Sequence, residues 1–347
     1  MEIYGKRWRM VNRVTNEQWL SEVEEEILDP SIAICDAHHH LWWREDSKYM
    51  LDDLLLDTNS GHRIVSTVFV ECNSMYQANV DISIAPVGET EFVQGIAAIS
   101  ASDTFGPTRV AKGIVSFADL TLGERVRTVL EAHQQAGANR FRGIRHASGW
   151  HASPEIRNSH TNPAEGLMSQ DKFLAGMSVL NDMGLTFDAW CYHHQISEFV
   201  KLARTFPGMT MILDHFGGPL GIGPYEGRLK EVFLEWKNNI QELIDCKNVY
   251  LKLGGLNMKL NGHGWHKRAL PPTSDELVDA TAPYYEECIN LFGADRCMFE
   301  SNFPVDKDSC SYAVLWNVFK KITSRNSIIE RQKLFHDTAV KVYRLID

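Results

Sequence analysis

Short runs of apolar, mostly β-branched residues alternate with helical patterns along most of this chain. Residues 32–40 form the first run and residues 63–72 the second. Short continuous apolar runs that end at turn residues are typical of buried strands. Further runs predict strands at residues 92–100, 139–145, 185–192, 209–215, 249–254 and 296–301. The pattern therefore predicts eight strands that are buried on both faces.

Helical periodicity fills most of the gaps between these runs. Apolar residues recur at helical spacing through residues 122–133, 173–183, 196–206 and 229–243. Buried strands separated by helices imply a parallel sheet, and eight of them imply an α/β fold of the (β/α)8 TIM barrel type. An open doubly wound sheet is the alternative, but the chain lacks the Gly-x-Gly-x-x-Gly motif that would support it.

The segment before the first strand is predicted to be an extension of the barrel. Apolar residues at helical spacing through residues 16–28, followed by Asp29-Pro30, predict a helix there. We therefore divide the chain into an N-terminal extension, residues 1–30, and one barrel domain, residues 31–347. A polar and aromatic loop at residues 42–62 is expected to help wall a site, with Tyr49 in contact with substrate.

Composition excludes several classes of partner. A formal net charge of −10 argues against nucleic acid and acidic membranes, and leaves a small molecule as the expected substrate. The seven cysteines form no Cys-x-x-Cys pair, which is typical of reduced thiols. Without a secretory signal or a long apolar run, the protein is expected to be cytoplasmic. Barrels of this size are often dimers, so a homodimer is compatible with the sequence.

The predicted ends of the strands carry more polar side chains than packing requires. In TIM barrels, the chemistry lies at the carboxyl ends of the strands. A single histidine after a strand is usually a hydrogen-bonded loop residue, but three histidine-bearing ends on one barrel favour an active site. The candidates are His38, His40, Glu71, Arg145, His193, His194, His215, Lys252 and Asn302.

Strand alternation narrows the geometry of these candidates. It places Asp36, His38 and His40 on one face of the first strand. Only one of His193 and His194 is expected to face inward, and the strand boundary does not decide which. Arg145 at a strand end is either an ion-pair partner or a clamp for a substrate carboxylate. Glu71 and Lys252 have similar alternatives: each pairs with a neighbouring protein group or contacts substrate.

Four segments, in this order, resemble motifs of the amidohydrolase superfamily. Residues 36–42 (Asp-Ala-His-His-His-Leu-Trp) resemble its strand-one Asp-x-His-x-His motif, and residues 213–217 (Leu-Asp-His-Phe-Gly) its strand-six motif. Residues 301–304 (Ser-Asn-Phe-Pro) resemble its strand-eight Ser-Asp-x-Pro motif. With residues 142–146 and 192–195, the set is most similar to the amidohydrolase-2 branch, which includes sugar lactonases and 2-pyrone-4,6-dicarboxylate lactonase.

The resemblance implies roles for individual residues. His38, His40 and His193 match positions that bind a divalent ion, Zn²⁺ first, in metal-dependent members, whereas some relatives use no metal. His215 matches a catalytic histidine. Asn302 stands where the family has an aspartate that orients or deprotonates the attacking water. Because asparagine cannot act as a base at neutral pH, either Glu71, Glu300 or Asp306 does that work or a metal-bound hydroxide needs no base.

These observations lead to one main hypothesis and several alternatives. The main hypothesis is a hydrolase that opens a sugar or dicarboxylate lactone, with His215 and Asn302 at the reacting centre. Arg145, Glu71, Tyr49 and Lys252 are expected to bind substrate. The alternatives are a non-oxidative decarboxylase of a related branch, hydrolysis of an amide or another ester, and a non-catalytic binding protein.

Overall fold

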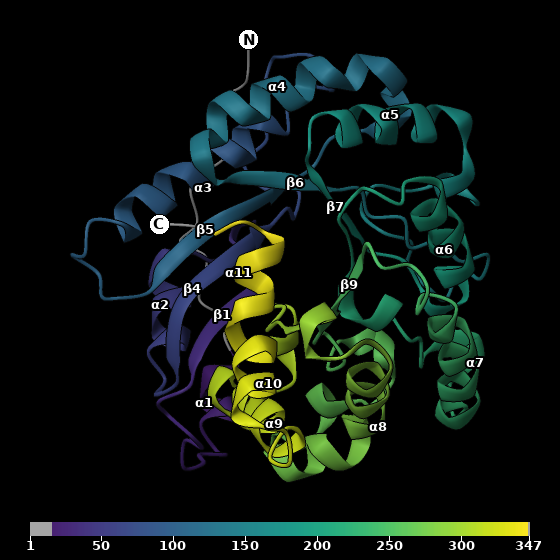
Figure 1. Cartoon of the computed structure of the whole chain (residues 1–347). Coiled ribbons are helices and arrows are strands. Elements are labelled where there is room, and N and C mark those ends of the chain that lie inside the picture. Colours follow the sequence, from purple (N-terminus) through teal and green to yellow (C-terminus); the bar gives the residue numbers. More distant parts are fainter. Residues whose placement is uncertain (1–15, 346–347) are drawn as a thin grey trace.

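The chain folds into a barrel of eight parallel strands. The computed structural model describes residues 16–345. Each strand of the large sheet pairs in parallel with the next one along the chain, which is the arrangement of a (β/α)8 TIM barrel (Figure 1). The strands are β1 (Ala33–His39), β4 (Arg63–Val70), β5 (Arg109–Ser116), β6 (Phe141–Arg145), β7 (Thr186–Ala189), β8 (Met211–Leu213), β9 (Val249–Leu253) and β10 (Cys297–Phe299).

The ring closes between β1 and the segment that follows β10. The backbone N–H of Asn302 donates to the carbonyl oxygen of His38 over 2.9 Å, and that of His40 donates to the carbonyl of Phe303 over 2.8 Å. His39 and Phe303 form an isolated parallel bridge. Closure therefore brings the strand-one histidines next to the strand-eight motif.

Helices surround the barrel in chain order, from the blue α3 to the yellow α10 in Figure 1. None of those in residues 16–345 is long and apolar enough to cross a bilayer. They are α1 (Glu17–Leu20), α2 (Leu51–Thr58), α3 (Val87–Ser100), α4 (Val126–Gly137), α5 (Asp171–Asp182), α6 (Ile196–Thr205), α7 (Leu229–Gln241), α8 (Ser274–Phe292), α9 (Tyr312–Ile322), α10 (Ile328–Gln332) and α11 (Thr338–Val342).

The predicted third strand is wrong. Residues 92–100 belong to helix α3, and the third strand of the barrel is β5. Val93, Ile96 and Ala97 are buried at helical spacing, so a short apolar run here is one face of a helix. In β5, Lys112 and Gly113 interrupt the apolar pattern that would have indicated a strand.

The helix predicted over residues 16–28 is also too long. Only Glu17–Leu20 is helical. Beyond it, the Glu25 carboxylate accepts hydrogen bonds from the backbone N–H of Ser274 (2.6 Å) and from Nδ2 of Asn317 (3.0 Å). The backbone N–H of Leu28 donates to Oδ1 of Asn317. Contacts with α8 and α9 thus replace the bonds that a longer helix would make.

Candidate active site

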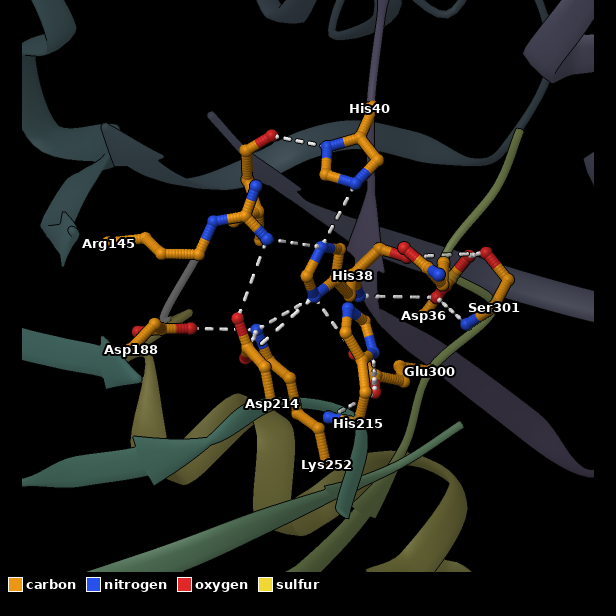
Figure 2. A network of polar contacts seen from close by, with 12 residues as sticks. Asp36, His38, His40, Arg145, Asp188, Asp214, His215, Lys252, Glu300 and Ser301 are labelled. Carbon is orange, nitrogen blue, oxygen red and sulfur yellow. Dashed lines mark hydrogen bonds and ion pairs between the residues drawn. The ribbon is translucent and has the colours of Figure 1, made fainter. Parts of the chain in front are cut away.

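Polar side chains from six strand ends meet around His38 (Figure 2). His38 and His40 come from the end of β1, and Arg145 is the last residue of β6. Asp214 and His215 directly follow β8, and Glu300 directly follows β10. Asp188 of β7 and Lys252 of β9 lie one position before the last residue of their strands. This convergence follows from the barrel, because parallel strands all end at the same rim.

The alternation along β1 breaks between Ala37 and His38. Ala37 packs inside the barrel, whereas the Asp36 carboxylate accepts hydrogen bonds from Oγ of Ser301 (2.6 Å) and Oη of Tyr312 (2.9 Å). The pairing of β1 with β4 shifts in register beyond Asp36, which turns His38 inward. The prediction that Asp36 shares a face with the two histidines is therefore wrong. Asp36 instead ties β1 to the strand-eight segment.

The two inward histidines point unprotonated nitrogens at each other. Nδ1 of His40 lies 2.8 Å from the carbonyl oxygen of Val70, which can only accept, so the His40 proton is assigned to Nδ1. Nε2 of His38 lies 3.3 Å from NH1 of Arg145, which can only donate, so this nitrogen is an acceptor. The two Nε2 atoms are 3.2 Å apart. Two lone pairs at this distance require a proton or a cation between them.

His215 and Glu300 form a hydrogen-bonded pair. Nδ1 of His215 lies 2.6 Å from Oε1 of Glu300, and the backbone N–H of His215 donates to the same oxygen over 3.2 Å. His215 has φ of 51°, an uncommon left-handed conformation that turns its ring into the site. A Cβ at Gly255 would lie 2.5 Å from Nδ1 of His215, so only glycine fits there. Burial lowers the pKa of His215 to about 3, so the imidazole is neutral at pH 7.

Lys252 is a buried cation beneath His38. Its Nζ lies 2.7 Å from Oδ2 of Asp188, 3.1 Å from Oδ1 of Asp214 and 3.4 Å from Nδ1 of His38. Burial alone would lower the pKa of Lys252, but Asp188 and Asp214 outweigh it and raise the pKa. Lys252 is therefore charged, and it does not line the pocket. This position favours a role in holding the site together over direct contact with substrate.

The donor groups around His38 fit a divalent cation. His38, Asp214 and His215 each offer a ligand atom, and these atoms lie within 4.8 Å of one another. Neither Asp214 oxygen receives a hydrogen bond from residues 16–345. In residues 16–345, four carboxyl groups of this cluster face two permanent cations, Arg145 and Lys252. The four carboxylates are Glu71, Asp188, Asp214 and Glu300.

Arg145 is held by Glu71. Nε of Arg145 lies 2.7 Å from Oε1 of Glu71, and NH2 donates to the backbone carbonyl of Glu71. Nε2 of His160 lies 3.0 Å from the other Glu71 oxygen. Burial would raise the pKa of Glu71, but His160 and Arg145 outweigh it and hold the pKa below its usual range. Glu71 thus serves as an internal counter-ion, and His160, from the segment between β6 and α5, joins the site.

Asn302 faces the pocket but is bonded away from the histidines. Its Nδ2 donates to Oδ2 of Asp306 over 2.9 Å, and Oδ1 of Asp306 accepts from the backbone N–H of Asn257. Of the carboxylates considered as substitutes for the missing strand-eight aspartate, only Glu300 contacts the site histidines His38 and His215. The carboxylate that contacts the site histidines thus lies two residues before Asn302, the position of the family's strand-eight aspartate.

Two predicted site residues lie elsewhere. Tyr49 is buried in β3 (Lys48–Tyr49), where its hydroxyl donates to Oδ2 of Asp57 over 2.6 Å, and it does not line the pocket. His193 lies four residues beyond the end of β7, and its Nδ1 accepts from the backbone N–H of Leu220. Its Nε2 lies 3.7 Å from Glu235. The predicted strand over 185–192 is too long, which is why His193 is not brought to His38 and His40.

A cavity of about 750 Å³ opens above these residues. His40, Arg145, His215 and Asn302 form part of its lining, and Trp190 packs edge-on against the ring of His215. Further lining residues are Trp42, Arg44, Cys72, Asn73, Ile156, Arg157, Asn158, Ser159, His160, Tyr192, Ile222, Met258, Lys259, Leu260, Val305 and Asp308. A site of this size accommodates a small metabolite.

Sequence reasoning missed Asp188 and Asp214 as members of the site. Asp188 lies in an otherwise apolar strand, and a carboxylate there requires a buried partner. Asp214 was part of the strand-six motif but was given no role. The available signal was an aspartate inside an apolar run, which is costly without a matching cation such as Lys252.

Comparisons with known proteins agree with this architecture. The amidohydrolase family model (Amidohydro_2) matches residues 35–345. An uncharacterised protein, y4mH, of Sinorhizobium fredii is 33% identical over 340 residues, which cover 90% of this chain and 99% of that protein. The L-rhamnono-gamma-lactonase of Scheffersomyces stipitis is 23% identical over 264 residues, which cover 68% of this chain and 70% of the lactonase.

Solved structures show the same fold. An amidohydrolase from Burkholderia multivorans, crystallised with bound zinc, superimposes with a TM-score of 0.68 at 20% identity, and the match covers 90% of this chain and all of that one. The family match spans the barrel and includes the residues that meet around His38. These residues are His38, His40, Arg145, Asp188, Asp214, His215, Lys252 and Glu300. This chain is therefore a member of the amidohydrolase family.

Proposed function

We propose that this amidohydrolase opens the ring of a small lactone by water attack at the carbonyl carbon. The observation that carries the proposal is the pairing of His215 with Glu300 at the floor of the pocket. A carboxylate on Nδ1 orients the imidazole and leaves Nε2 free to take and return a proton. The resemblance to a sugar lactonase supports this choice of ester.

His215 is the proposed proton carrier. Because burial lowers its pKa to about 3, the ring is neutral near pH 7 and Nε2 can accept the proton of the attacking water. The new C–O bond forms at the carbonyl carbon, and the bond from that carbon to the ring oxygen then breaks. His215 returns the proton to the departing ring oxygen, so the product is a hydroxy acid. Glu300 steadies the ring throughout.

His38 and Asp214 of the cation-binding group are proposed to act on the carbonyl side as ligands for a divalent ion, Zn²⁺ first. His40 is proposed as the further ligand in place of His215, whose Nε2 is kept for the proton. Such an ion supplies Lewis acidity and lowers the pKa of water. Two observations support this assignment: the Nε2 atoms of His38 and His40 converge, and the Asp214 oxygens, although ion-paired with Lys252, receive no hydrogen bond from residues 16–345. NH1 of Arg145, 3.3 Å from Nε2 of His38, adds positive charge where the oxyanion would form.

The pocket also favours an anionic substituent on the lactone. Arg44 and Arg157 line it together with Arg145. Arg145 is bound to Glu71, whereas the guanidinium of Arg157 has no hydrogen bond or ion pair to another described side chain. Arg157 is therefore better placed than Arg145 to bind a substrate carboxylate.

Proton release from a panel of sugar and dicarboxylate lactones tests the proposal. A pH indicator reports ring opening by the purified chain, before and after zinc is added. We expect turnover of at least one lactone. Release of CO₂ from aromatic carboxylic acids with no lactone turnover would instead establish a decarboxylase, and no turnover of either kind would favour a binding protein.

His215→Asn is the matched variant for this assay. It keeps a hydrogen-bonding side chain of similar size and removes the titrating nitrogen. We expect turnover to fall by about 10²–10⁴-fold while the far-UV spectrum and thermal midpoint stay close to those of the parent. A loss of less than tenfold in a folded variant would exclude His215 as the proton carrier.

A further inference from the structure

The C-terminal segment fills the lower half of the barrel, at the opposite end from the pocket. Val342, Tyr343 and Leu345 pack against inward-facing residues of several strands, among them Val68, Ile212 and Met298. Tyr343 is fully buried. A Cβ at Gly113 of β5 would lie 2.8 Å from Cδ2 of Leu345, so the strand leaves space for this segment. The chain thus returns to the inside of its own barrel after the last outer helix.

Tyr343 is the member of this segment that contacts the buried polar residues Asp188 and Lys252. Its hydroxyl donates to Oδ2 of Asp188 over 2.5 Å, and Nζ of Lys252 lies 2.7 Å from the same oxygen. The ammonium also lies 5.3 Å from the centroid of the phenol ring. Among residues 16–345, the other oxygen of Asp188 has no hydrogen-bond partner. Tyr343 and Lys252 together therefore fix the orientation of this carboxylate.

Lys252 in turn contacts two residues of the proposed reaction centre. Its Nζ faces Asp214 at 3.1 Å and His38 at 3.4 Å. Without the Tyr343 hydroxyl, Oδ2 of Asp188 would lose one of its two donors inside an apolar shell. The carboxylate would then turn to regain a partner, and Lys252 would move with it. A shift of Lys252 changes the charge next to Asp214 and His38 directly.

We propose that Tyr343 is a positioning residue of this site, holding Lys252 beneath His38 and Asp214 through the carboxylate of Asp188. The effect on turnover rests on the proposed function, whereas the effects on Lys252 and on zinc affinity do not depend on the substrate. Tyr343 does not line the pocket, so its loss should lower kcat and leave KM nearly unchanged.

Tyr343→Phe tests the proposal, because it removes only the hydroxyl and keeps the packing. Tyr250→Phe is the matched control: Tyr250 packs against the same cluster, and its hydroxyl makes no hydrogen bond within the described residues. Crystal structures of the parent and both variants should show a displaced Lys252 in Tyr343→Phe alone. Zinc affinity, measured by chelator competition, and kcat should each fall by about 10–100-fold in the same variant.

A double-mutant cycle separates an effect of Tyr343 on the position of Lys252 from a general effect on the stability of the fold. In a Lys252→Met background, Tyr343→Phe should have no further effect on kcat or zinc affinity, because the residue through which it acts is gone. Additive losses, or an unmoved Lys252 in the Tyr343→Phe crystal, would overturn the proposal. If the parent opens no lactone, the proposed function fails by itself, and the position of Lys252 and the zinc affinity still decide the role of Tyr343.

Discussion

At the scale of single residues, the site depends on where carboxylates can lie inside a barrel. Asn302 cannot act as a base, and its amide is bonded to Asp306. Glu300, two residues earlier, contacts His215 and His38 instead. Burial raises the pKa of Glu300 to about 8, with Lys252 and the backbone N–H of His215 acting in the opposite direction. Glu300 therefore holds a proton for most of the time near pH 7, and added positive charge next to it, such as a bound divalent cation, would favour its carboxylate form.

Glu300→Gln should be far more harmful than Asp306→Asn. The glutamine amide has only one accepting oxygen and no negative charge, so it can accept from His215 but places an NH2 donor against His38. We expect kcat to fall by about 10²–10⁴-fold with a small change in KM. Asp306→Asn should cost less than tenfold, because Asp306 contacts the backbone of Asn257 and the amide of Asn302 and no site histidine. Steady-state kinetics on the preferred lactone measure both, and the reverse order would identify Asp306 as the working carboxylate.

At the scale of elements, side chains near helix and strand ends hold the outer layer to the barrel. His62, just before β4, lies 2.7 Å from Nζ of Lys320 of α9 through Nδ1 and 3.0 Å from the carbonyl of Ala313 through Nε2. Because the Ala313 carbonyl can only accept and the Lys320 ammonium can only donate, the His62 proton is assigned to Nε2. Protonation of Nδ1 would place the charged His62 ring in contact with the Lys320 ammonium. This contact between α9 and the start of β4 therefore requires a neutral histidine.

The contact between His62 and Lys320 should make the free energy of unfolding depend on pH. Burial, together with the Lys320 ammonium, lowers the pKa of His62 from 6.5 to about 4. Because the folded pKa lies below the unfolded one, the unfolded chain binds more protons between these values. The contribution is therefore fully present above pH 6.5 and is lost as the pH falls toward 4.

Urea unfolding of the parent and His62→Gln at pH 7.5, 6.0 and 5.0 measures this contribution. Below pH 6.5, the free energy of unfolding of the parent should fall more steeply than that of the variant, by up to about 1.4 kcal/mol per pH unit. Other buried histidines affect both proteins equally, so the difference isolates His62. Parallel pH profiles would contradict the assignment.

At the scale of the whole molecule, the barrel gathers an excess of negative charge around one point. In the described residues, the four carboxyl groups of Glu71, Asp188, Asp214 and Glu300 outnumber the two permanent cations, Arg145 and Lys252. The pKa of Asp214 is raised by burial to about 6, in spite of Lys252. Added positive charge at this point should therefore stabilise the fold as a whole.

Zinc should raise the thermal midpoint of the metal-stripped protein. At 100 times its dissociation constant, a single bound ion adds about 2.7 kcal/mol to the free energy of unfolding. Differential scanning fluorimetry across a zinc series measures the shift, and metal analysis gives the stoichiometry. His38→Asn should abolish the shift, whereas His193→Asn should keep it, because His193 contacts Leu220 and Glu235 and neither His38 nor His40. Loss of zinc in His193→Asn would restore the ligand set that the sequence suggested.

Much of the architecture is determined locally. The apolar runs of seven of the eight strands, the spacing of the main helices and the residues His38, His40, Arg145 and His215 at strand ends can be predicted because burial on both faces and the common strand rim leave a pattern in the sequence. The run at residues 92–100 cannot be assigned in this way, because a short apolar run fits a strand and a buried helix face equally well.

The partners of these residues are decided only by tertiary structure. A one-residue bulge in β1 sends Asp36 away from His38, and the early end of β7 leaves His193 outside the cluster. Glu300, Asp214, Lys252 and Tyr343 come together from distant parts of the chain. The residue types that reach the rim, and the fold that carries them, follow from the pattern of apolar and polar residues. Which of them meet depends on register, bulges and barrel closure, since these are set by packing across the whole molecule rather than by neighbours along the chain.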